Sequence, residues 1–277
     1  TEFGGVGCGT NCTKRVCPHQ FIEILWEGYE GCSNKVQIED KRSRSFSIEI
    51  GLKQGCVLSP TLFNLFINDV VPHIKAVMRG YQVGQLHAKI LLFADDIVFI
   101  GESEDDIQKA MDGLAEYGDK WRVQVSTEKT KVMCNVKETM MVTFKQKPIQ
   151  QVQCFKYLGV HLQSNGRWDT AQEYMLDKAK KRMQQFHRIF RNPFLSIKSK
   201  ATIGRACIWP ILEYGSEIIQ PPQPQKFQSL LHLLGCKALS CNRHTGREAV
   251  RGDLGWPSIE ARWAQHKIKA WIKGNTS

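Results

Sequence analysis

Short apolar runs separated by turn residues dominate the chain as far as the Asn165–Gly166 dipeptide. The clearest pair lies at residues 90–94 and 97–100, which are rich in Ile, Val, Leu and Phe and flank the adjacent carboxylates Asp95 and Asp96. This pattern predicts a largely buried β-hairpin with both carboxylates at its tip. Other apolar runs predict strands at residues 36–39, 45–50, 122–125, 131–136, 141–145 and 152–161.

Apolar residues also recur every three or four positions in residues 21–28, 60–71 and 107–121, which predicts three helices. We expect Ser59 to cap the second helix, because a serine before Pro60 is a typical helix start. Ser103, with an acidic residue three positions later, is placed to cap the third.

Beyond the Asn165–Gly166 turn, helical periodicity takes over almost completely. Pro210 should kink or end one of the predicted helices, because proline cannot continue a helical hydrogen-bond pattern. Helices are predicted at residues 169–191, 196–214, 224–234 and 258–273, with a short one opened by a capping box at residues 245–248.

These elements predict an α+β fold with three consecutive regions. An irregular leader occupies residues 1–20, an antiparallel sheet with packed helices occupies residues 21–164, and an all-helical region occupies residues 165–277. With 277 residues, 42% of them hydrophobic and 23% charged, the chain can bury a sizeable core and form one or two domains.

The chain has ten cysteines, but it has neither a secretory leader nor an apolar run long enough to span a bilayer. Reduced thiols in an intracellular protein, nuclear or cytoplasmic and not secreted, are therefore a better interpretation than disulfides. Cys8, Cys12, Cys17 and His19 are of types that bind zinc, but their spacing matches no common zinc motif. We therefore expect no zinc.

Positive charge is concentrated in the last third of the chain. Residues 169–277 carry 18 Lys and Arg against eight Asp and Glu, which accounts for +10 of the net charge of +11. Residues 178–205 hold nine cations and no acidic residue, interleaved with Phe186, Phe190 and Phe194. Such a stripe is typical of a surface that contacts a phosphate backbone, with a solvated helix face as the plainer alternative. The candidate nucleic-acid-binding residues are Lys178, Lys180, Lys181, Arg182, Arg188, Arg191, Lys198 and Lys200.

Several motifs of the strand-rich region resemble those of a known family. Residues 51–60 read GLKQGCVLSP and precede TLFNLFINDVV, and residues 93–96 read FADD. A segment with Lys129 and the sequence FKYLGV at residues 155–160 follow in the same order and at similar spacing. Together these features resemble the reverse transcriptases of non-LTR, LINE-like retrotransposons, over about residues 21–271.

The resemblance implies a right-handed polymerase palm followed by a helical thumb. The implied activity is that of an RNA-directed DNA polymerase, which performs nucleotidyl transfer with two metal ions, Mg²⁺ or Mn²⁺. The implied partners are an RNA template, a DNA primer and deoxynucleoside triphosphates, without a membrane. The sequence indicates no particular oligomeric state.

The resemblance also implies roles for individual residues. Asp95 and Asp96 would be catalytic carboxylates that bind metal, and Lys129 would lie near the nucleotide phosphates, where its ammonium group could neutralise the leaving group. The residues implied to contact nucleotide or template are Gln54, Gly55, Ser59 and Phe93, and those of a primer grip are Tyr157, Leu158 and Gly159. Each has a plain structural alternative, namely a solvated turn, a loop amide, a solvated lysine or a core hairpin.

The sequence departs from the family pattern before Gly51. A second catalytic aspartate is expected there in the pattern Phe/Tyr-x-Asp-x-x-x-Ala-Phe/Tyr, but residues 1–50 do not contain it. The finger region is missing too, and Ser126 replaces the usual asparagine upstream of Lys129. We therefore expect the C-terminal part of a reverse transcriptase. The alternative is a catalytically inactive palm–thumb remnant that only binds RNA or DNA.

Overall fold

The computed structural model describes residues 19–47, 51–53, 55–136 and 138–275. The chain divides into a first compact unit, residues 1–132 with 139–151, and a second, residues 133–138 with 152–277. Helices are mixed with small sheets, in agreement with the predicted α+β class. Of the predicted leader, only His19 and Gln20 are described, and they begin a helix. The domain boundaries predicted at residues 20 and 164 stay predictions.

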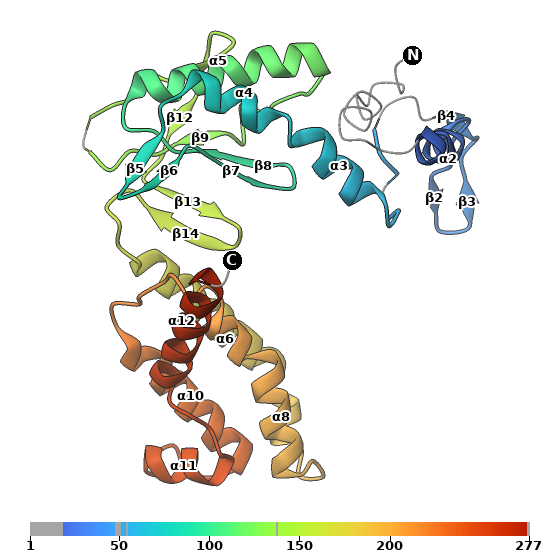
Figure 1. Cartoon of the computed structure of the whole chain (residues 1–277). Coiled ribbons are helices and arrows are strands. Elements are labelled where there is room, and N and C mark those ends of the chain that lie inside the picture. Colours follow the sequence, from blue (N-terminus) through green and yellow to red (C-terminus); the bar gives the residue numbers. More distant parts are fainter. Residues whose placement is uncertain (1–18, 48–50, 54, 137, 276–277) are drawn as a thin grey trace. The chain divides into compact units, whose positions relative to one another are not determined.

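The first unit combines helices with short ribbons (Figure 1). Its described helices are α2 (His19–Tyr29), α3 (Ser59–Ile67), α4 (Val70–Val77) and α5 (Glu104–Trp121). Its described strands are β1 (Ser33–Asn34), β2 (Gln37–Ile38), β3 (Lys41–Arg42), β4 (Phe46–Ser47), β5 (Tyr81–Val83), β6 (Leu86–Ala88), β7 (Ile90–Phe93), β8 (Asp96–Phe99), β9 (Lys131–Val132), β10 (Thr143–Phe144), β11 (Lys147–Pro148) and β12 (Gln150–Gln151). The pairs β1–β4, β2–β3, β5–β6, β7–β8 and β10–β11 are antiparallel, and β9–β12 is parallel. The described strands thus form two-stranded ribbons rather than one larger sheet.

The core of the first unit lies between α4 and α5, which pack against each other. Val70 and Ile74 of α4 are fully buried, as is Ala110 of α5. Gly113 allows the close approach of the two helices, because a Cβ atom there would lie only 3.1 Å from a methyl group of Val77. The apolar face predicted for residues 107–121 is therefore confirmed as core, whereas the single helix predicted over residues 60–71 is wrong, because α3 ends at Ile67 and α4 begins at Val70.

A buried carboxylate joins the end of α4 to the start of α5. Ser103 Oγ accepts a hydrogen bond from the amide of Asp106, and so caps α5 as predicted. The Asp106 side chain, only 4% exposed, accepts hydrogen bonds from the amides of Arg79 (2.5 Å) and Gly80 (2.8 Å). Asp106 therefore has a tertiary role that a capping pattern in the sequence does not reveal.

We expect Asp106→Ala to lower the free energy of unfolding by about 3–5 kcal/mol, because two backbone N–H groups lose a charged acceptor. Asp106→Asn should cost less, since its amide oxygen can still accept. Urea unfolding followed by circular dichroism measures both effects. The control is Asp105→Ala, whose carboxylate is exposed and should contribute little. An Asp106→Ala protein as stable as the wild type would contradict the assigned role.

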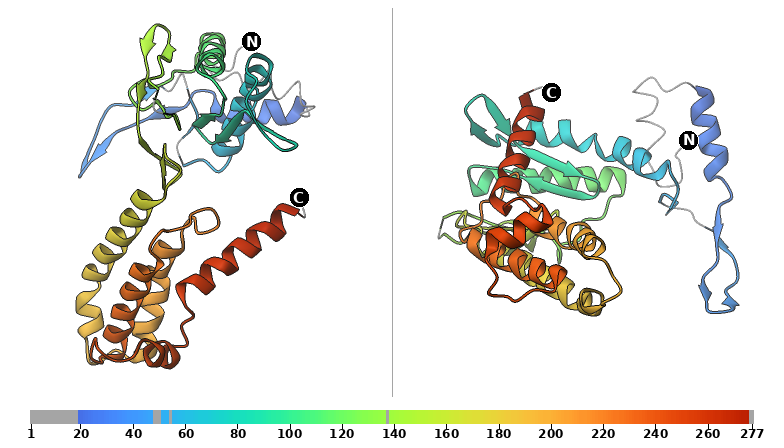
Figure 2. Two further views of the ribbon diagram at one scale, coloured as in Figure 1. Left: turned by 90° about the vertical axis from the view of Figure 1, so that its left-hand side faces the viewer. Right: turned by 90° about the horizontal axis from the view of Figure 1, so that it is seen from below.

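The second unit is a hairpin followed by helices (Figures 1 and 2). The hairpin consists of β13 (Cys154–Tyr157) and β14 (Val160–Gln163). The described helices are α6 (Asp169–Gln185), α7 (His187–Arg191), α8 (Ile197–Cys207), α9 (Trp209–Glu213), α10 (Pro224–Leu239), α11 (Arg247–Leu254) and α12 (Ile259–Asn275). Helix α10 packs against both α6 and α8 around a core that includes the fully buried Ala179, Phe227 and Leu234. None of the described helices meets the length and apolarity that a bilayer crossing demands.

Two of the predicted strand assignments are wrong for local reasons. Residues 122–125 form no strand, because Arg122 has a φ of +56° and ends α5, while the Val123 amide donates to the Gly118 carbonyl. The pairing of the strands predicted at residues 36–39 and 45–50 differs as well, because residues 41–42 between them form β3 and pair with β2 across a turn at Glu39, which has a φ of +53°.

The predicted cap at Ser59 is also wrong. Its hydroxyl donates to the carbonyl of Lys53 (2.7 Å) and lies 3.1 Å from the Tyr29 hydroxyl, so Leu58 takes the N-cap position without a side-chain bond. Helix α11 likewise follows Gly246 without a side-chain cap, which contradicts the capping box predicted there. Pro210, in contrast, lies in the first turn of the new helix α9, as predicted.

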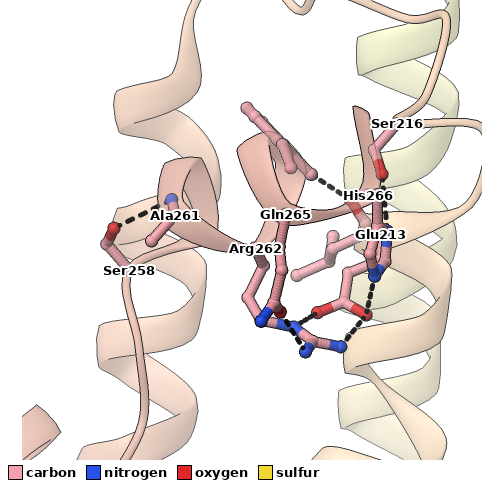
Figure 3. A network of polar contacts seen from close by, with 9 residues as sticks. Glu213, Ser216, Ser258, Ala261, Arg262, Gln265 and His266 are labelled. Atoms are coloured by element: carbon pink, nitrogen blue, oxygen red, sulfur yellow. Dashed lines mark hydrogen bonds and ion pairs between the residues drawn. The ribbon is translucent and has the colours of Figure 1, made fainter. Parts of the chain in front are cut away.

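A polar network attaches α12 to α9 (Figure 3). Arg262 donates from Nε and Nη2 to the two carboxylate oxygens of Glu213, at 2.7 and 3.0 Å. His266 reaches the same carboxylate with Nε2 at 3.7 Å, and its Nδ1 lies 2.9 Å from the hydroxyl of the buried Ser216. The hydrogen bonds to Glu213 raise the pKa of the Arg262 guanidinium. The first half of α12 is therefore held by charge-assisted bonds as well as by apolar packing.

Candidate active site and nucleic-acid-binding surface

The predicted β-hairpin with the two carboxylates is confirmed. Strands β7 and β8 pair in a register that places Phe93 opposite Asp96, which leaves Ala94 and Asp95 as a two-residue turn. Ala94 has a φ of +51°, in the left-handed region that residues with a Cβ atom seldom adopt. The tight turn thus places Asp95 at the tip and Asp96 at the first position of the returning strand.

The hairpin tip is exposed, so the prediction of a largely buried hairpin is wrong. Phe93 is 60% exposed and Leu91 46%, and both carboxylates are exposed as well. Neither the Asp95 nor the Asp96 side chain forms a hydrogen bond or ion pair with any other residue that the structure describes. Solvent therefore relieves the repulsion between the two anions, and their oxygens stay available to a ligand.

Carboxylates suit Mg²⁺ or Mn²⁺, but among the described residues this site supplies only two carboxylate side chains, Asp95 and Asp96. Within the described ranges, no three residues of the types His, Cys, Asp and Glu are grouped so that they could hold a metal ion. The donor chemistry at Asp95 and Asp96 thus fits a hard cation, while the number of protein ligands falls short of a complete set. The candidate zinc ligands Cys8, Cys12 and Cys17 lie outside the described residues.

The other residues implied for nucleotide and template contact lie in loops of the same unit. Gln54 lies outside the described residues, and the neighbouring Gly55 is exposed with a φ of +84°. Lys129 is exposed in a turn that the amide and hydroxyl of Thr130 close by bonding to the Ser126 carbonyl. No hydrogen bond or ion pair between described residues joins these loops to Asp95 or Asp96.

The turn implied to grip the primer is braced by a tyrosine that the sequence motifs do not indicate. Leu158 and Gly159, between β13 and β14, both have positive φ, +46° and +83°. The Tyr214 hydroxyl donates to the Leu158 carbonyl at 2.6 Å, and a Cβ atom on Gly159 would lie 3.1 Å from the Tyr214 ring. Glycine is therefore required at this turn by conformation and by space.

We define the basic surface as the exposed cations of α6, α7 and α8, namely Lys178, Lys180, Lys181, Arg182, Arg188, Arg191, Lys198 and Arg205. Most lack an acidic partner among the described residues, although Lys181 pairs with Asp177 at 2.7 Å. Lys200 is the exception, because it is 5% exposed and its ammonium donates toward Ser240 Oγ at 3.4 Å. Its assignment as a nucleic-acid contact is therefore corrected to a buried structural lysine.

A tyrosine and two lysines extend positive charge from the basic surface to the hairpin. Lys156 of β13 donates to the Tyr174 hydroxyl at 3.0 Å, and its ammonium lies 4.8 Å from the ring centroid. The Lys178 ammonium lies 5.8 Å from the same ring. The hydrogen bond from Lys156 lowers the pKa of Tyr174. Burial, helped by Lys156, lowers the pKa of the neighbouring His161, which keeps that imidazole neutral. Sequence periodicity did not single out Lys156 or Tyr174, because they meet only in the folded unit.

Comparison with known families identifies the class of protein. The sequence model of the family described as "Reverse transcriptase (RNA-dependent DNA polymerase)" matches residues 10–162, more than half of the chain. The chain therefore belongs to the reverse transcriptase family. The match begins about ten residues before the stretch that the motifs indicated, so part of the predicted leader belongs to the family region.

Curated relatives narrow the class to the reverse transcriptases of non-LTR retrotransposons, as the motifs predicted. The RNA-directed DNA polymerase from mobile element jockey of Drosophila melanogaster is 23% identical over 216 residues, 74% of this chain and 23% of that protein. Its counterpart from Drosophila funebris is 30% identical over 158 residues, 54% and 17% of the two chains. The probable RNA-directed DNA polymerase from transposon BS of Drosophila melanogaster is 23% identical over 268 residues, 91% and 29%. The chain thus spans less than a third of each of these relatives.

Proposed function

We propose that this chain forms the palm and thumb portion of an RNA-directed DNA polymerase of a non-LTR retrotransposon. The observation that carries the proposal is the Asp95–Asp96 pair at an exposed hairpin tip, in a chain of the reverse transcriptase family. In this proposal the first unit supplies palm elements, and the helices of the second unit supply the thumb. The substrates are an RNA template, a DNA primer and deoxynucleoside triphosphates.

Each group of site residues has a distinct task in this proposal. Asp95 and Asp96 hold a divalent cation, which when bound lowers the pKa of the attacking primer oxygen and stabilises the leaving oxygen. Lys129 offers its ammonium to the nucleotide phosphates. The loop residues Gln54, Gly55 and Ser59, with Phe93, position nucleotide and template. The Tyr157–Gly159 turn positions the primer end, and the basic surface holds the phosphate backbone.

Primer extension on an RNA template tests the proposal. The polypeptide for this test joins residues 1–277 to a family segment that carries the upstream aspartate. Synthesis that depends on Asp95, and that is lost in Asp95→Ala, would support the polymerase assignment. Absence of synthesis, in a polypeptide that still binds primer and template, would favour the alternative of a nucleic-acid-binding remnant. The observation that favours this alternative is that the part of the chain that the structure describes brings only two candidate metal ligands to the hairpin tip.

We expect residues 1–277 to bind Mg²⁺ or Mn²⁺ weakly, with a dissociation constant no tighter than about millimolar. Two exposed carboxylates from one turn provide few protein ligands, and Mg²⁺ gives up its water reluctantly. Calorimetric titration with MgCl₂ measures this affinity, and Asp95→Asn is the variant to compare. Micromolar binding that disappears in Asp95→Asn would show that a further residue ligates the metal.

A further inference from the structure

Of the three phenylalanines interleaved with the cations of residues 178–205, only one is displayed to solvent. Phe190 is 2% exposed and packs in the core, and Phe186 is partly buried against that core. Phe194, in contrast, is 94% exposed. The Phe194 ring is therefore not part of the core, and it is accessible to a ligand beside the cations of the basic surface.

The segment that carries Phe194 is a preorganised turn. It connects α7 to α8 and lies at the end of the helical bundle away from the β13–β14 hairpin (Figures 1 and 2). Asn192 Oδ1 accepts a hydrogen bond from the Phe194 amide at 2.9 Å, and the Asn192 amide donates to the Ile189 carbonyl at 3.1 Å. Ser196 then caps α8 by accepting from the Ser199 amide. The backbone on both sides of the ring is thus fixed by hydrogen bonds.

The charged residues close to Phe194 in the chain are all cationic. Arg188 and Arg191 precede it on α7, and Lys198 follows it on α8, all three exposed and without an ion pair to a described residue. Arg191 and Lys198 are three and four residues away, within about 11 and 14 Å even for an extended chain.

We infer that Phe194 is a stacking platform for an unpaired base of a nucleic-acid strand whose phosphates Arg188, Arg191 and Lys198 contact. Every base presents a π-face, so an aromatic ring beside cations selects single-stranded over fully paired nucleic acid without reading the sequence. The inference rests on the proposed nucleic-acid-binding function of the basic surface. It adds to that function a preference for unpaired nucleotides at the end of the bundle.

Fluorescence anisotropy with labelled 20-nucleotide RNA strands tests this inference. Phe194→Ala should weaken binding of the base-bearing strand about 5- to 150-fold, the range measured for loss of one base–aromatic stack. It should leave unchanged the affinity for an abasic strand of equal length, which has the phosphates but no bases. The salt dependence should also stay unchanged, whereas Arg188→Ala should reduce the slope of log Kd against log salt by about 0.7. Phe194→Trp should keep an affinity near that of the wild type, because its ring can stack on a base. Phe194→Leu should lose affinity as Phe194→Ala does.

Several outcomes would overturn the inference. If Phe194→Ala weakens binding of the base-bearing and abasic strands equally, or if Phe194→Leu binds RNA with wild-type affinity, no base stacks on the ring. If Phe194→Ala loses binding to vesicles that contain anionic lipid while its RNA affinity is unchanged, Phe194 would instead contact a membrane surface. If the wild-type chain binds no strand in a salt-dependent way, the proposed function of the basic surface fails as well, which separates the two failures.

Discussion

A polypeptide of residues 1–277 alone is expected to extend no primer, even with Mg²⁺ and all four deoxynucleoside triphosphates. Among the described residues, only two candidate metal-binding carboxylates come together at the β7–β8 turn, and a symmetric two-metal clamp needs another from a neighbouring strand. The family's finger pattern is not expected within these 277 residues, and without it contacts that position the nucleotide for attack would be lost. Positioning contributes roughly 7–11 kcal/mol in favourable cases, so its loss alone can bring turnover below detection.

The assay compares this polypeptide with one that carries an upstream segment with the Phe/Tyr-x-Asp pattern, on the same primed RNA template. Synthesis should appear only in the longer polypeptide, and Asp95→Ala should abolish it there. Binding of the primed template should be similar in both polypeptides, which excludes misfolding as the cause. Robust synthesis by residues 1–277 would instead mean that an acidic residue before Gly51, such as Glu23, Glu27, Glu39, Asp40 or Glu49, supplies the second ligand.

Replacing Lys180, Lys181, Arg182 and Arg188 together by alanine should weaken nucleic-acid binding by at least about tenfold at 100 mM salt, for all sequences alike. Each lost phosphate contact reduces counterion release, so the slope of log Kd against log salt should fall by about 3 in total. The share of Lys181 should be the smallest, because its ammonium already pairs with Asp177. Filter-binding titrations between 50 and 200 mM salt measure both quantities.

A charge-matched control separates a local surface from the net charge of the chain. Lys35, Lys41, Arg42 and Arg44 are exposed around the β2–β3 ribbon of the first unit, and their replacement removes the same four charges. This control should change affinity far less than the variant of the basic surface. Equal losses in the two variants, or no loss in either, would refute binding through α6 and α7.

The sequence predicted best where structure is decided by neighbouring residues. Two apolar runs around Asp95 and Asp96 were enough to predict the β7–β8 hairpin, because pairing across a two-residue turn is local. The exposure of its tip was not predictable, since apolar composition does not say whether a partner element covers Phe93. The same limit explains Lys200, which is one of the nine cations of residues 178–205 but is buried beside Ser240, the residue that caps the end of α10. The cap predicted at Ser59 was wrong because the Ser59 hydroxyl hydrogen-bonds with the hydroxyl of Tyr29, a residue distant in the sequence.

The Glu213–Arg262 ion pair anchors one end of α12. Its first half is fixed at α9, while Ile268 and Trp271 beyond His266 are 58% and 70% exposed, and the helix projects away from the bundle in Figure 2. Residues 267–275 continue as rigid helix for about 13 Å. The orientation of this projecting half is therefore set by the Glu213–Arg262 ion pair together with the buried Ile259 and Trp263 of the first half.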